Sequence, residues 1–320
     1  MKRKIFIYSS IYMVLLLIIR LTTACNDDDS PADSSPTSGS PFDLDTALEL
    51  GRLSLQAYQM LTDFEQGKTF TLPSPYQLVV QILTPEAFEG EPIPSEPIPI
   101  AFIAKNDDNI YVVFRGTKTI VEWIDDAMFA QVPYTFVDDG GMTEQGFTNI
   151  YGTIHDSIVN AVNNLSSTGT FSNLFITGHS LGAALAILAV PELTENTSFK
   201  NPIMYNFAGP RVGNIHFVNE LYNPLNITSW RVVNTNDVVP TLPPTTVIII
   251  DPPGVFFYEH VNSEEAITFG NPISGPFDFT DIEFNHSMCN YYNTLCDMTS
   301  DPDTCKAMAD GADSCNPPSQ

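Results

Sequence analysis

Basic residues are scarce in this chain of 320 residues, which contains 13 lysines and arginines against 38 aspartates and glutamates. The resulting formal charge of −25 repels phosphate backbones, so the composition argues against a nucleic acid partner. The acidic balance bears on solubility rather than on the fold. Because 43% of the residues are hydrophobic, the chain can still bury one substantial core, and we expect a single folded domain.

A long apolar run is missing except near the start, where Ile5 to Ile19 gives fifteen residues after the basic "MKRK". A bilayer-spanning helix needs about 20 apolar residues, so this run predicts a signal peptide over residues 1–24. The following "LTTACNDDDS" resembles the lipobox of bacterial lipoproteins, which implies lipid attachment at Cys25. Ordinary secretion and an uncleaved anchor are the alternatives. We therefore expect an extracytoplasmic protein that is attached to a membrane through Cys25, or is otherwise secreted.

Cysteine is also sparse, and four of the five cysteines lie in the last 32 residues. An even, local set outside the cytoplasm predicts two disulfides, and three pairings are possible. A zinc site is the alternative, although no CxxC pair occurs. The four residues are Cys289, Cys296, Cys305 and Cys315.

The pattern of apolar residues divides the chain into a tether, a folded region and a tail. Residues 25–41 are acidic and rich in serine and proline, which predicts a disordered tether. The folded domain is expected over 42–298, and a cysteine-containing tail over 299–320. Helices are expected over 42–61, 150–165 and 181–193, and strands over 76–83, 98–104, 109–116, 173–178, 202–209 and 230–234. This alternation predicts an α/β fold with a mainly parallel sheet covered on both faces, whose ligands bind beyond the carboxyl ends of the strands.

One serine, Ser180, has a glycine two positions away on either side within "LFITGHSLGAALAIL". Ser180 follows an apolar strand and precedes a helix, which is the context of a nucleophile elbow. Gly178 and Gly182 suit this interpretation, because the sharp turn leaves no space for side chains. The alternative is a serine that only caps the helix.

A serine nucleophile needs a base and an acid, which follow an elbow of this kind in the order Ser, Asp, His. Asp237 comes directly after the predicted strand 230–234, although a turn-capping aspartate is the alternative. Two histidines lie beyond it. His260 falls in "FFYEHVNSEEAITFG", which alternates like a strand, whereas His286 begins a helix-like run. A histidine on a loop reaches the serine more readily, and this context, together with the family resemblance given next, favours His286 over His260 as the base.

Five motifs in succession resemble those of the class 3 lipases, the fungal triacylglycerol lipase family: "VVFRGT", "GHSLGAA", "GPRVGN", "NTNDVVPTLPP" and a late "NH". The resemblance extends from about Leu44 to Leu295. It implies an α/β-hydrolase fold and a catalytic triad of Ser180, Asp237 and His286.

The negative charge of a tetrahedral intermediate requires an oxyanion hole. One donor is expected to be the backbone N–H of Leu181, the residue after the nucleophile. The resemblance places the second donor at Thr117, after the glycine of "FRG", and assigns Asp126 to steadying it.

The segment "KTIVEWIDDAMFA" resembles the family's lid, and Ile120, Val121, Trp123 and Ile124 would form its apolar side. An amphipathic lid hides the pocket in water and opens at a lipid surface. The alternative is that these residues belong permanently to the core.

Together these features predict a serine lipase that hydrolyses acylglycerol esters in two acyl-transfer steps at a lipid–water interface. The alternatives are a phospholipase A1, a feruloyl or short-chain esterase, and a non-catalytic binding protein on the same scaffold. The sequence predicts no metal or organic cofactor, because no ligand cluster or phosphate-binding glycine loop appears. The tail has no counterpart in the family, and we hypothesise that its disulfides hold it near the His286 loop.

Overall fold

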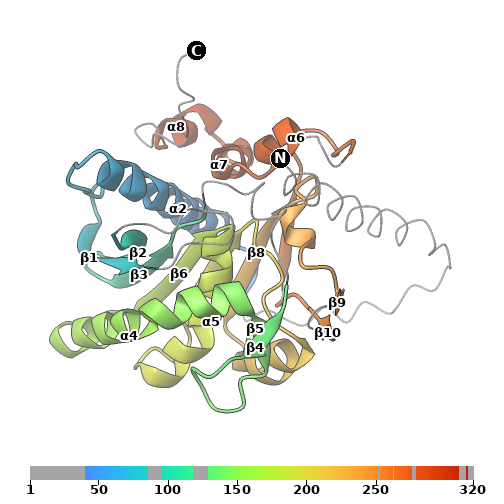
Figure 1. Cartoon of the computed structure of the whole chain (residues 1–320). Coiled ribbons are helices and arrows are strands. Elements are labelled where there is room, and N and C mark those ends of the chain that lie inside the picture. Colours follow the sequence, from blue (N-terminus) through green and yellow to red (C-terminus); the bar gives the residue numbers. More distant parts are fainter. Residues whose placement is uncertain are drawn as a thin grey trace.

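The structure is a computed structural model that describes residues 40–85, 96–117, 129–250, 253–261, 263–275, 279–309 and 315. Within this part of the chain, the central sheet has seven strands in the order β1-β2-β3-β6-β7-β8-β11 (Figure 1). The strands are β1 (Gln77–Thr84), β2 (Ile98–Lys105), β3 (Asn109–Phe114), β6 (Asn173–His179), β7 (Ile203–Phe207), β8 (Thr228–Asn234) and β11 (Glu264–Ile267). The first three pair antiparallel, and from β3 to β11 the pairing is parallel. This sheet confirms the predicted mainly parallel α/β fold.

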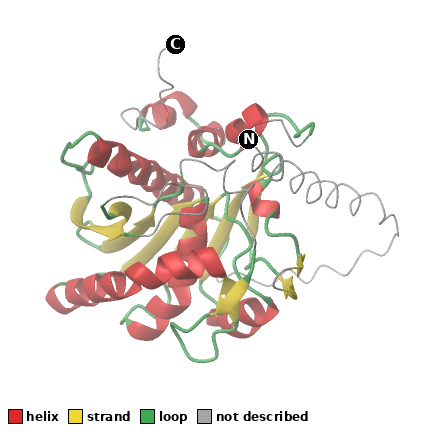
Figure 2. Ribbon diagram, viewed as in Figure 1, coloured by secondary structure: helices red, strands yellow, loops and turns green. Residues whose placement is uncertain are grey.

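Helices cover both faces of the sheet, as Figure 2 shows. On one face lie α2 (Leu44–Glu65) and α7 (Met288–Asp297), and on the other lie α4 (Gln145–Thr168) and α5 (Leu181–Asn196). The side chains of one strand therefore alternate between two hydrophobic cores: Val112 belongs to the core of α4 and α5, and Tyr111 to that of α2. Because both faces are buried at the centre of the sheet, β2, β3 and β6 are nearly continuous apolar runs rather than half-polar ones.

The three predicted helices are confirmed, although each of them extends beyond a predicted bound. The helix expected over 150–165 begins five residues earlier, at Gln145, because the carboxylate of Glu144 accepts a hydrogen bond from the backbone N–H of Phe147 (2.8 Å). Such a side-chain cap satisfies a donor that has no partner inside the helix. The α2 helix is capped in the same way by Asp43.

Smaller elements lie around the sheet. Two further pairs of strands are separate from the main sheet, β4–β5 and β9–β10. Their bounds, and those of the short helices, are β4 (Gln131–Pro133), β5 (Met142–Glu144), β9 (Thr246–Ile250), β10 (Pro253–Phe257), η1 (Phe217–Tyr222), η2 (Asn223–Leu225), η3 (Val239–Thr241), α6 (Phe279–Asn285) and α8 (Pro302–Ala307). None of the helices that the structure describes has the length and apolar character needed to cross a membrane.

The prediction of one strand through His260 is wrong. The chain forms β10 up to Phe257 and resumes as β11 at Glu264, and His260 lies in the connection between them. There Glu259 pairs with Gly213, outside the main sheet, and Ser263 has a positive φ of 55°. A non-glycine residue in this conformation interrupts extended structure.

The four late cysteines form two disulfides, which confirms the predicted pair and leaves no thiolate for the alternative zinc site. Cys289 is bonded to Cys315, and Cys296 to Cys305. Both bonds start from α7 and tie it to the tail. The segments 1–24 and 25–41, with Cys25, fall almost entirely outside the described residues.

Candidate active site

The serine between Gly178 and Gly182 occupies a strained turn between β6 and α5. Ser180 has φ 60° and ψ −124°, which a residue with a side chain rarely adopts. A Cβ atom on Gly178 would lie 2.3 Å from the carbonyl oxygen of Gly182, so the turn accepts no side chain there. The backbone N–H of Ser180 donates to the carbonyl of Phe207 on the neighbouring β7 (3.0 Å). These contacts hold the serine in the geometry of a nucleophile elbow.

The end of β3 packs directly against this elbow. A Cβ on Gly182 would lie 2.4 Å from the carbonyl oxygen of Phe114, and one on Gly116 would lie 2.7 Å from that of His179. These close approaches place Gly116, the residue before Thr117, against the elbow from which Leu181 begins α5. As the first helical residue, Leu181 has a backbone N–H without an acceptor inside the helix. The oxyanion hole expected from Thr117 and Leu181 stays a prediction, and its two positions lie on segments that pack against each other.

Asp237 and His286 are joined by a hydrogen bond. The Nδ1 atom of His286 lies 2.8 Å from Oδ2 of Asp237, and both side chains are buried. Asp237 follows the end of β8 by three residues, and His286 lies between α6 and α7. The other carboxylate oxygen, Oδ1, accepts from the backbone N–H of Val239 (3.0 Å). Asp237 therefore caps its own turn, as the alternative interpretation expected, and also orients a histidine.

The ring of His286 lies beside the elbow. Its centroid is 4.7 Å from that of His179, the residue immediately before Ser180. The Nε2 atom of His286 is buried and has no hydrogen-bond partner within the described part of the chain. A neutral imidazole that donates through Nδ1 presents a lone pair at Nε2, which is the atom that a general base uses. Catalytic hydrogen bonds often tighten only when a substrate binds.

The preceding histidine, His179, has a positioning role that the sequence did not disclose. Its Nε2–H donates to the backbone carbonyl of His286 (2.9 Å), and its Nδ1 accepts from the hydroxyl of Tyr58 (2.7 Å). Burial, together with the nearby His286, holds the pKa of His179 well below its usual value. His179 is therefore neutral and fixes the backbone of His286. Its motif position marked it as special, but Tyr58 lies 121 residues away, so its partner left no local signal.

The acid has a second support that the sequence also did not reveal. The hydroxyl of Tyr291 donates to Oδ2 of Asp237 (2.8 Å) and accepts from the backbone N–H of Asn234 (2.9 Å). Burial, and then the charge of Asp237, raise the pKa of Tyr291 well above its usual value, so the hydroxyl stays protonated. A side-chain amide completes the network, because Asn285 donates to the carbonyl of Asn236 (3.0 Å).

The other candidate base, His260, is engaged elsewhere. Its Nε2–H donates to the carbonyl of Pro240 (2.7 Å), and the ring is close to Arg231 and Arg211. Burial and these two positive charges hold its pKa well below the usual value. Of the two histidines weighed from the sequence, only His286 is bonded to Asp237.

Several predicted residues fall outside the described part of the chain. They are Asp126, expected to steady the oxyanion hole, and the expected lid residues Ile120, Val121, Trp123 and Ile124. Among the residues that the structure describes, no three histidine, cysteine, aspartate or glutamate side chains come together in a way that could hold a metal ion.

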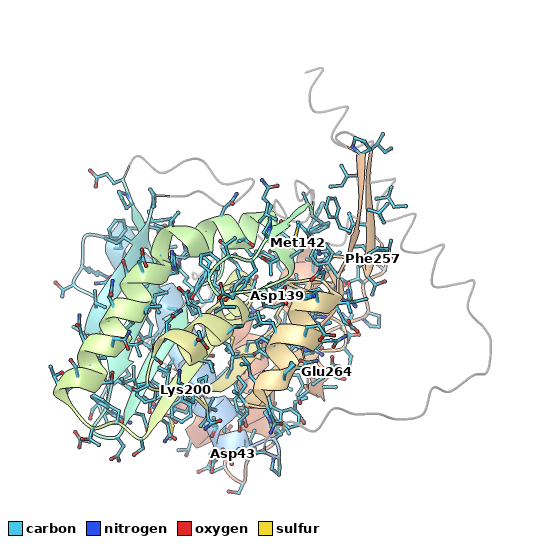
Figure 3. The ribbon with its side chains drawn as sticks, turned by 90° about the horizontal axis from the view of Figure 1, so that it is seen from below. Asp43, Asp139, Met142, Lys200, Phe257 and Glu264 are labelled. Atoms are coloured by element: carbon cyan, nitrogen blue, oxygen red, sulfur yellow. A yellow bond between two sulfur atoms is a disulfide. The ribbon has the colours of Figure 1, made fainter. Side chains whose placement is uncertain are left out.

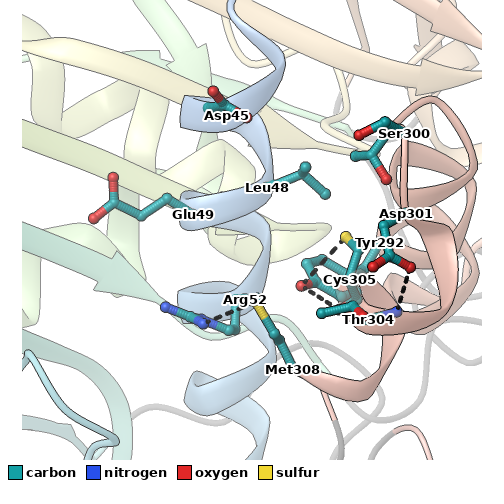
Figure 4. Close-up of a pocket in the computed structure, with 11 residues that line it drawn as sticks. Asp45, Leu48, Glu49, Arg52, Tyr292, Ser300, Asp301, Thr304, Cys305 and Met308 are labelled. Carbon is teal, nitrogen blue, oxygen red and sulfur yellow. Dashed lines mark hydrogen bonds between the residues drawn. The ribbon is translucent and has the colours of Figure 1, made fainter.

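A cavity of about 370 Å³ lies away from this site, between α2 and the helices α7 and α8 (Figure 4). None of Ser180, Asp237 and His286 lines it. Its wall contains charged groups of both signs, among them Arg52, whose guanidinium approaches Tyr76 Oη (3.4 Å) and Met308 Sδ (3.7 Å). The cavity is therefore separate from the elbow and its histidine.

A serine held at the end of a parallel strand, beside a histidine that is bonded to an aspartate, is the arrangement of serine hydrolases with the α/β-hydrolase fold. The comparisons with known proteins agree with this class. Residues 111–247 match the family model described as Lipase (class 3). This matched segment is similar to the class 3 lipases.

Individual relatives support the same assignment. A lipase from Rhizomucor miehei is 33% identical over 188 residues, which are 57% of this chain and 49% of that protein. A chloroplastic phospholipase A1-Igamma3 from Arabidopsis thaliana is 32% identical over 161 residues, 42% of this chain and 30% of its own length. The matched part thus spans half or less of the length of these relatives. The solved native Rhizomucor miehei lipase propeptide complex superposes with a TM-score of 0.55 at 25% identity, over 76% of this chain and 78% of the other.

Proposed function

We propose that the protein is a serine ester hydrolase that acts on acylglycerol lipids through an acyl-enzyme on Ser180. The observation that carries this proposal is the hydrogen bond between His286 and Asp237, with the histidine ring packed beside the strained serine. A binding scaffold has no need of this combination. The match to the class 3 lipase family model and the similarity to the Rhizomucor miehei lipase support the choice of acylglycerol as the substrate class.

The proposed reaction has two steps. His286 Nε2 takes the hydroxyl proton of Ser180 while the serine oxygen bonds to the ester carbonyl carbon, and the protonated imidazole then gives this proton to the departing alcohol. Water next attacks the acyl-enzyme with the same histidine as base, which releases the fatty acid and restores the serine. The carboxylate of Asp237 keeps Nδ1 protonated and stabilises the transient imidazolium, and the N–H groups of Leu181 and Thr117 would face the developing oxyanion.

Phospholipase A1 activity is the second candidate, because a plant phospholipase A1 is among the relatives of the chain. Both reactions use the same acyl-enzyme, so the catalytic residues do not distinguish them. A feruloyl or short-chain esterase would also use this machinery. The lid assigned to Ile120, Val121, Trp123 and Ile124 favours acyl lipids over soluble esters and remains part of this proposal.

For the location, we propose an extracytoplasmic protein. The two disulfides support this, because such bonds persist in oxidising compartments. Membrane attachment through a lipidated Cys25 remains a proposal that rests on the sequence alone.

The decisive test is the substitution Ser180→Ala. We expect the turnover of emulsified triacylglycerol, phosphatidylcholine and p-nitrophenyl esters to fall at least about 10³-fold, because the nucleophile is lost. In the wild-type protein, the ratio of the rates on triacylglycerol and phosphatidylcholine distinguishes a lipase from a phospholipase. The matched control is Ser229→Ala, a buried serine of β8 whose hydroxyl contacts Tyr222.

An unchanged rate in the Ser180→Ala variant would refute the assignment of the nucleophile. Labelling by a fluorophosphonate addresses the non-catalytic alternative. We expect one labelled site that disappears with Ser180→Ala, whereas an unlabelled, folded wild-type protein would favour the binding scaffold.

A further inference from the structure

The β9–β10 hairpin carries an apolar face that no described part of the protein covers. Its outward side chains are Ile248 (69% exposed), Ile250 (79%), Val255 (55%) and Phe257 (52%). Ile248 lies opposite Val255 in the antiparallel register, so these side chains form one continuous surface. Figure 3 shows the hairpin standing out from the body of the molecule beyond the labelled Phe257.

The base of this hairpin is fixed to the body. On its inner face, Val247 and Phe256 pack against the main hydrophobic core. At the end of β10, the side-chain amide of Gln131 donates to the carbonyl of Phe257 (2.8 Å). The hydroxyl of Tyr258 donates to the carbonyl of Phe129 (2.9 Å). The exposed face is therefore a property of the folded state and not of a loose end.

The hairpin rises beside the candidate active site. The chain enters β9 nine residues after Asp237, and His260, three residues after β10, donates to Pro240 in the loop of that acid. The match to the class 3 lipase family model ends at residue 247, inside β9, so most of the hairpin lies beyond the matched segment. The apolar face of the hairpin thus lies next to the candidate active site.

The chemistry of the hairpin restricts what can cover it. None of the residues 246–250 and 253–257 is charged, whereas the whole chain has a net charge of −25. An anionic surface would be repelled, so a neutral or zwitterionic one is favoured. In the described part of the chain the two strands pair only with each other, which leaves backbone donors and acceptors along both edges. Such groups are costly in hydrocarbon but can bond to water and head groups at an interface.

We propose that the β9–β10 hairpin is a lipid-docking arm, which inserts Ile248, Ile250, Val255 and Phe257 into the head-group zone of a neutral lipid surface and so holds the active site against it. For the identity of the surface the inference rests on the proposed function, because an acylglycerol substrate is itself the apolar partner. A second copy of the chain fits less well. A stable protein interface buries about 800 Å² on each partner, more than four side chains of a short two-stranded ribbon present.

The test measures adsorption without catalysis. Full-length Ser180→Ala protein, with and without the double substitution Ile248→Ser and Ile250→Ser, is mixed with triolein droplets coated with phosphatidylcholine, and the free protein is measured after flotation. We expect the hairpin substitutions to weaken adsorption about tenfold or more, because two exposed apolar side chains no longer leave water. The matched control is Val79→Ser with Leu83→Ser on β1, an edge strand of the central sheet. These two side chains are 38% and 46% exposed.

Equal adsorption of the hairpin variant and the β1 control would overturn the proposal. So would light scattering that shows a dimer in the parent and a monomer in the hairpin variant with adsorption unchanged, because the face would then bind a second copy. All proteins carry the same N-terminal residues, so any anchor contributes equally. A failure of the proposed function shows itself separately, as absent turnover of a water-soluble ester by the protein with Ser180 intact, whatever the adsorption result.

Discussion

Tyr291 connects three parts of the site through one hydroxyl group. It donates to the carboxylate of Asp237 and accepts from the backbone of Asn234 at the end of β8, while its ring belongs to α7. Two donors therefore converge on Oδ2 of Asp237, from Tyr291 and from His286. Such convergence stabilises a buried carboxylate in its charged form and fixes the direction in which it faces the imidazole.

Replacing this tyrosine tests the role of its hydroxyl. For Tyr291→Phe we expect kcat to fall about tenfold with little change in KM, because Asp237 loses one of its charge-assisted hydrogen bonds, each worth about 1.5–3 kcal/mol. The stability should fall by about 1–2 kcal/mol, since the N–H of Asn234 loses its acceptor. The measurements are ester hydrolysis kinetics and urea unfolding.

The neighbouring tyrosine provides the control. Tyr292 donates to the carbonyl of Cys305 and does not contact Asp237. If Tyr292→Phe lowers kcat as much as Tyr291→Phe, the effect belongs to the packing of α7 and not to support of the acid.

At the scale of residues, the sequence predicted those groups whose role follows from their immediate neighbours in the chain. Ser180 stands in a motif whose glycines are explained by local backbone contacts, and Asp237 follows a strand that is evident from its apolar pattern. The sequence could not disclose Tyr58 or Tyr291, because their partners lie 121 and 54 positions away along the chain. A tyrosine in a helix looks the same in sequence whether it fills a core or donates to a carboxylate.

The helix α7 concentrates several functions in ten residues. It carries Cys289 and Cys296, one from each disulfide, with Tyr291 between them, and it begins two residues after His286. The hypothesis that the disulfides hold the tail near the His286 loop fits this arrangement. Since α7 also packs on α2, the proposed base His286 lies next to a helix that is held both by the disulfides and by this packing.

Removing one disulfide tests this coupling. The double substitution Cys296→Ala and Cys305→Ala opens a loop closed over a separation of nine residues, for which the chain-entropy relation gives a loss of about 2–3 kcal/mol. We expect urea unfolding to show this loss of unfolding free energy. The fall in kcat, expressed as an activation free energy, should be smaller than this loss, because Cys289–Cys315 still ties α7 to the tail. The matched control, Cys25→Ala, removes a cysteine that belongs to neither disulfide. A double variant as stable as this control would contradict the prediction.

At the scale of elements, the apolar periodicity predicted the sheet and its covering helices, whereas the region 256–270 was misjudged. The alternation in "FFYEHVNSEEAITFG" arises from two separate strands and a connection between them. Tyr258 and Val261 are buried there by tertiary contacts, Tyr258 through its hydroxyl on Phe129. Periodicity registers that alternate residues point inward, but not which sheet they pair with.

The pH dependence of the stability belongs to the molecule as a whole. Burial, with neighbouring groups, holds the pKa values of His179 and His260 well below that of a free imidazole, about 6.5. Below about pH 6.5 the unfolded chain takes up protons that the folded state refuses, so the stability falls as the pH falls. The two histidines together contribute a slope of up to about 2.7 kcal/mol per pH unit, and none above about pH 7.5.

Urea unfolding between pH 5 and 8 measures this slope in the wild type, in His260→Gln and in His216→Gln. We expect His260→Gln to reduce the slope by about half of the histidine contribution, and His216→Gln serves as the control substitution of a more exposed histidine. A slope that is equal in all three proteins would show that carboxylates alone govern the acid sensitivity.

The burial of the nucleophile has a kinetic consequence. Ser180 exposes only 1% of its surface, and His286 only 5%, so an ester carbonyl cannot reach bonding distance of the serine in this arrangement. For the proposed hydrolysis, every turnover would include an excursion to a more open form, and its frequency would set a ceiling on the catalytic rate. A covalent inhibitor would meet the same ceiling, and its rate of reaction would level off with concentration at the rate of opening.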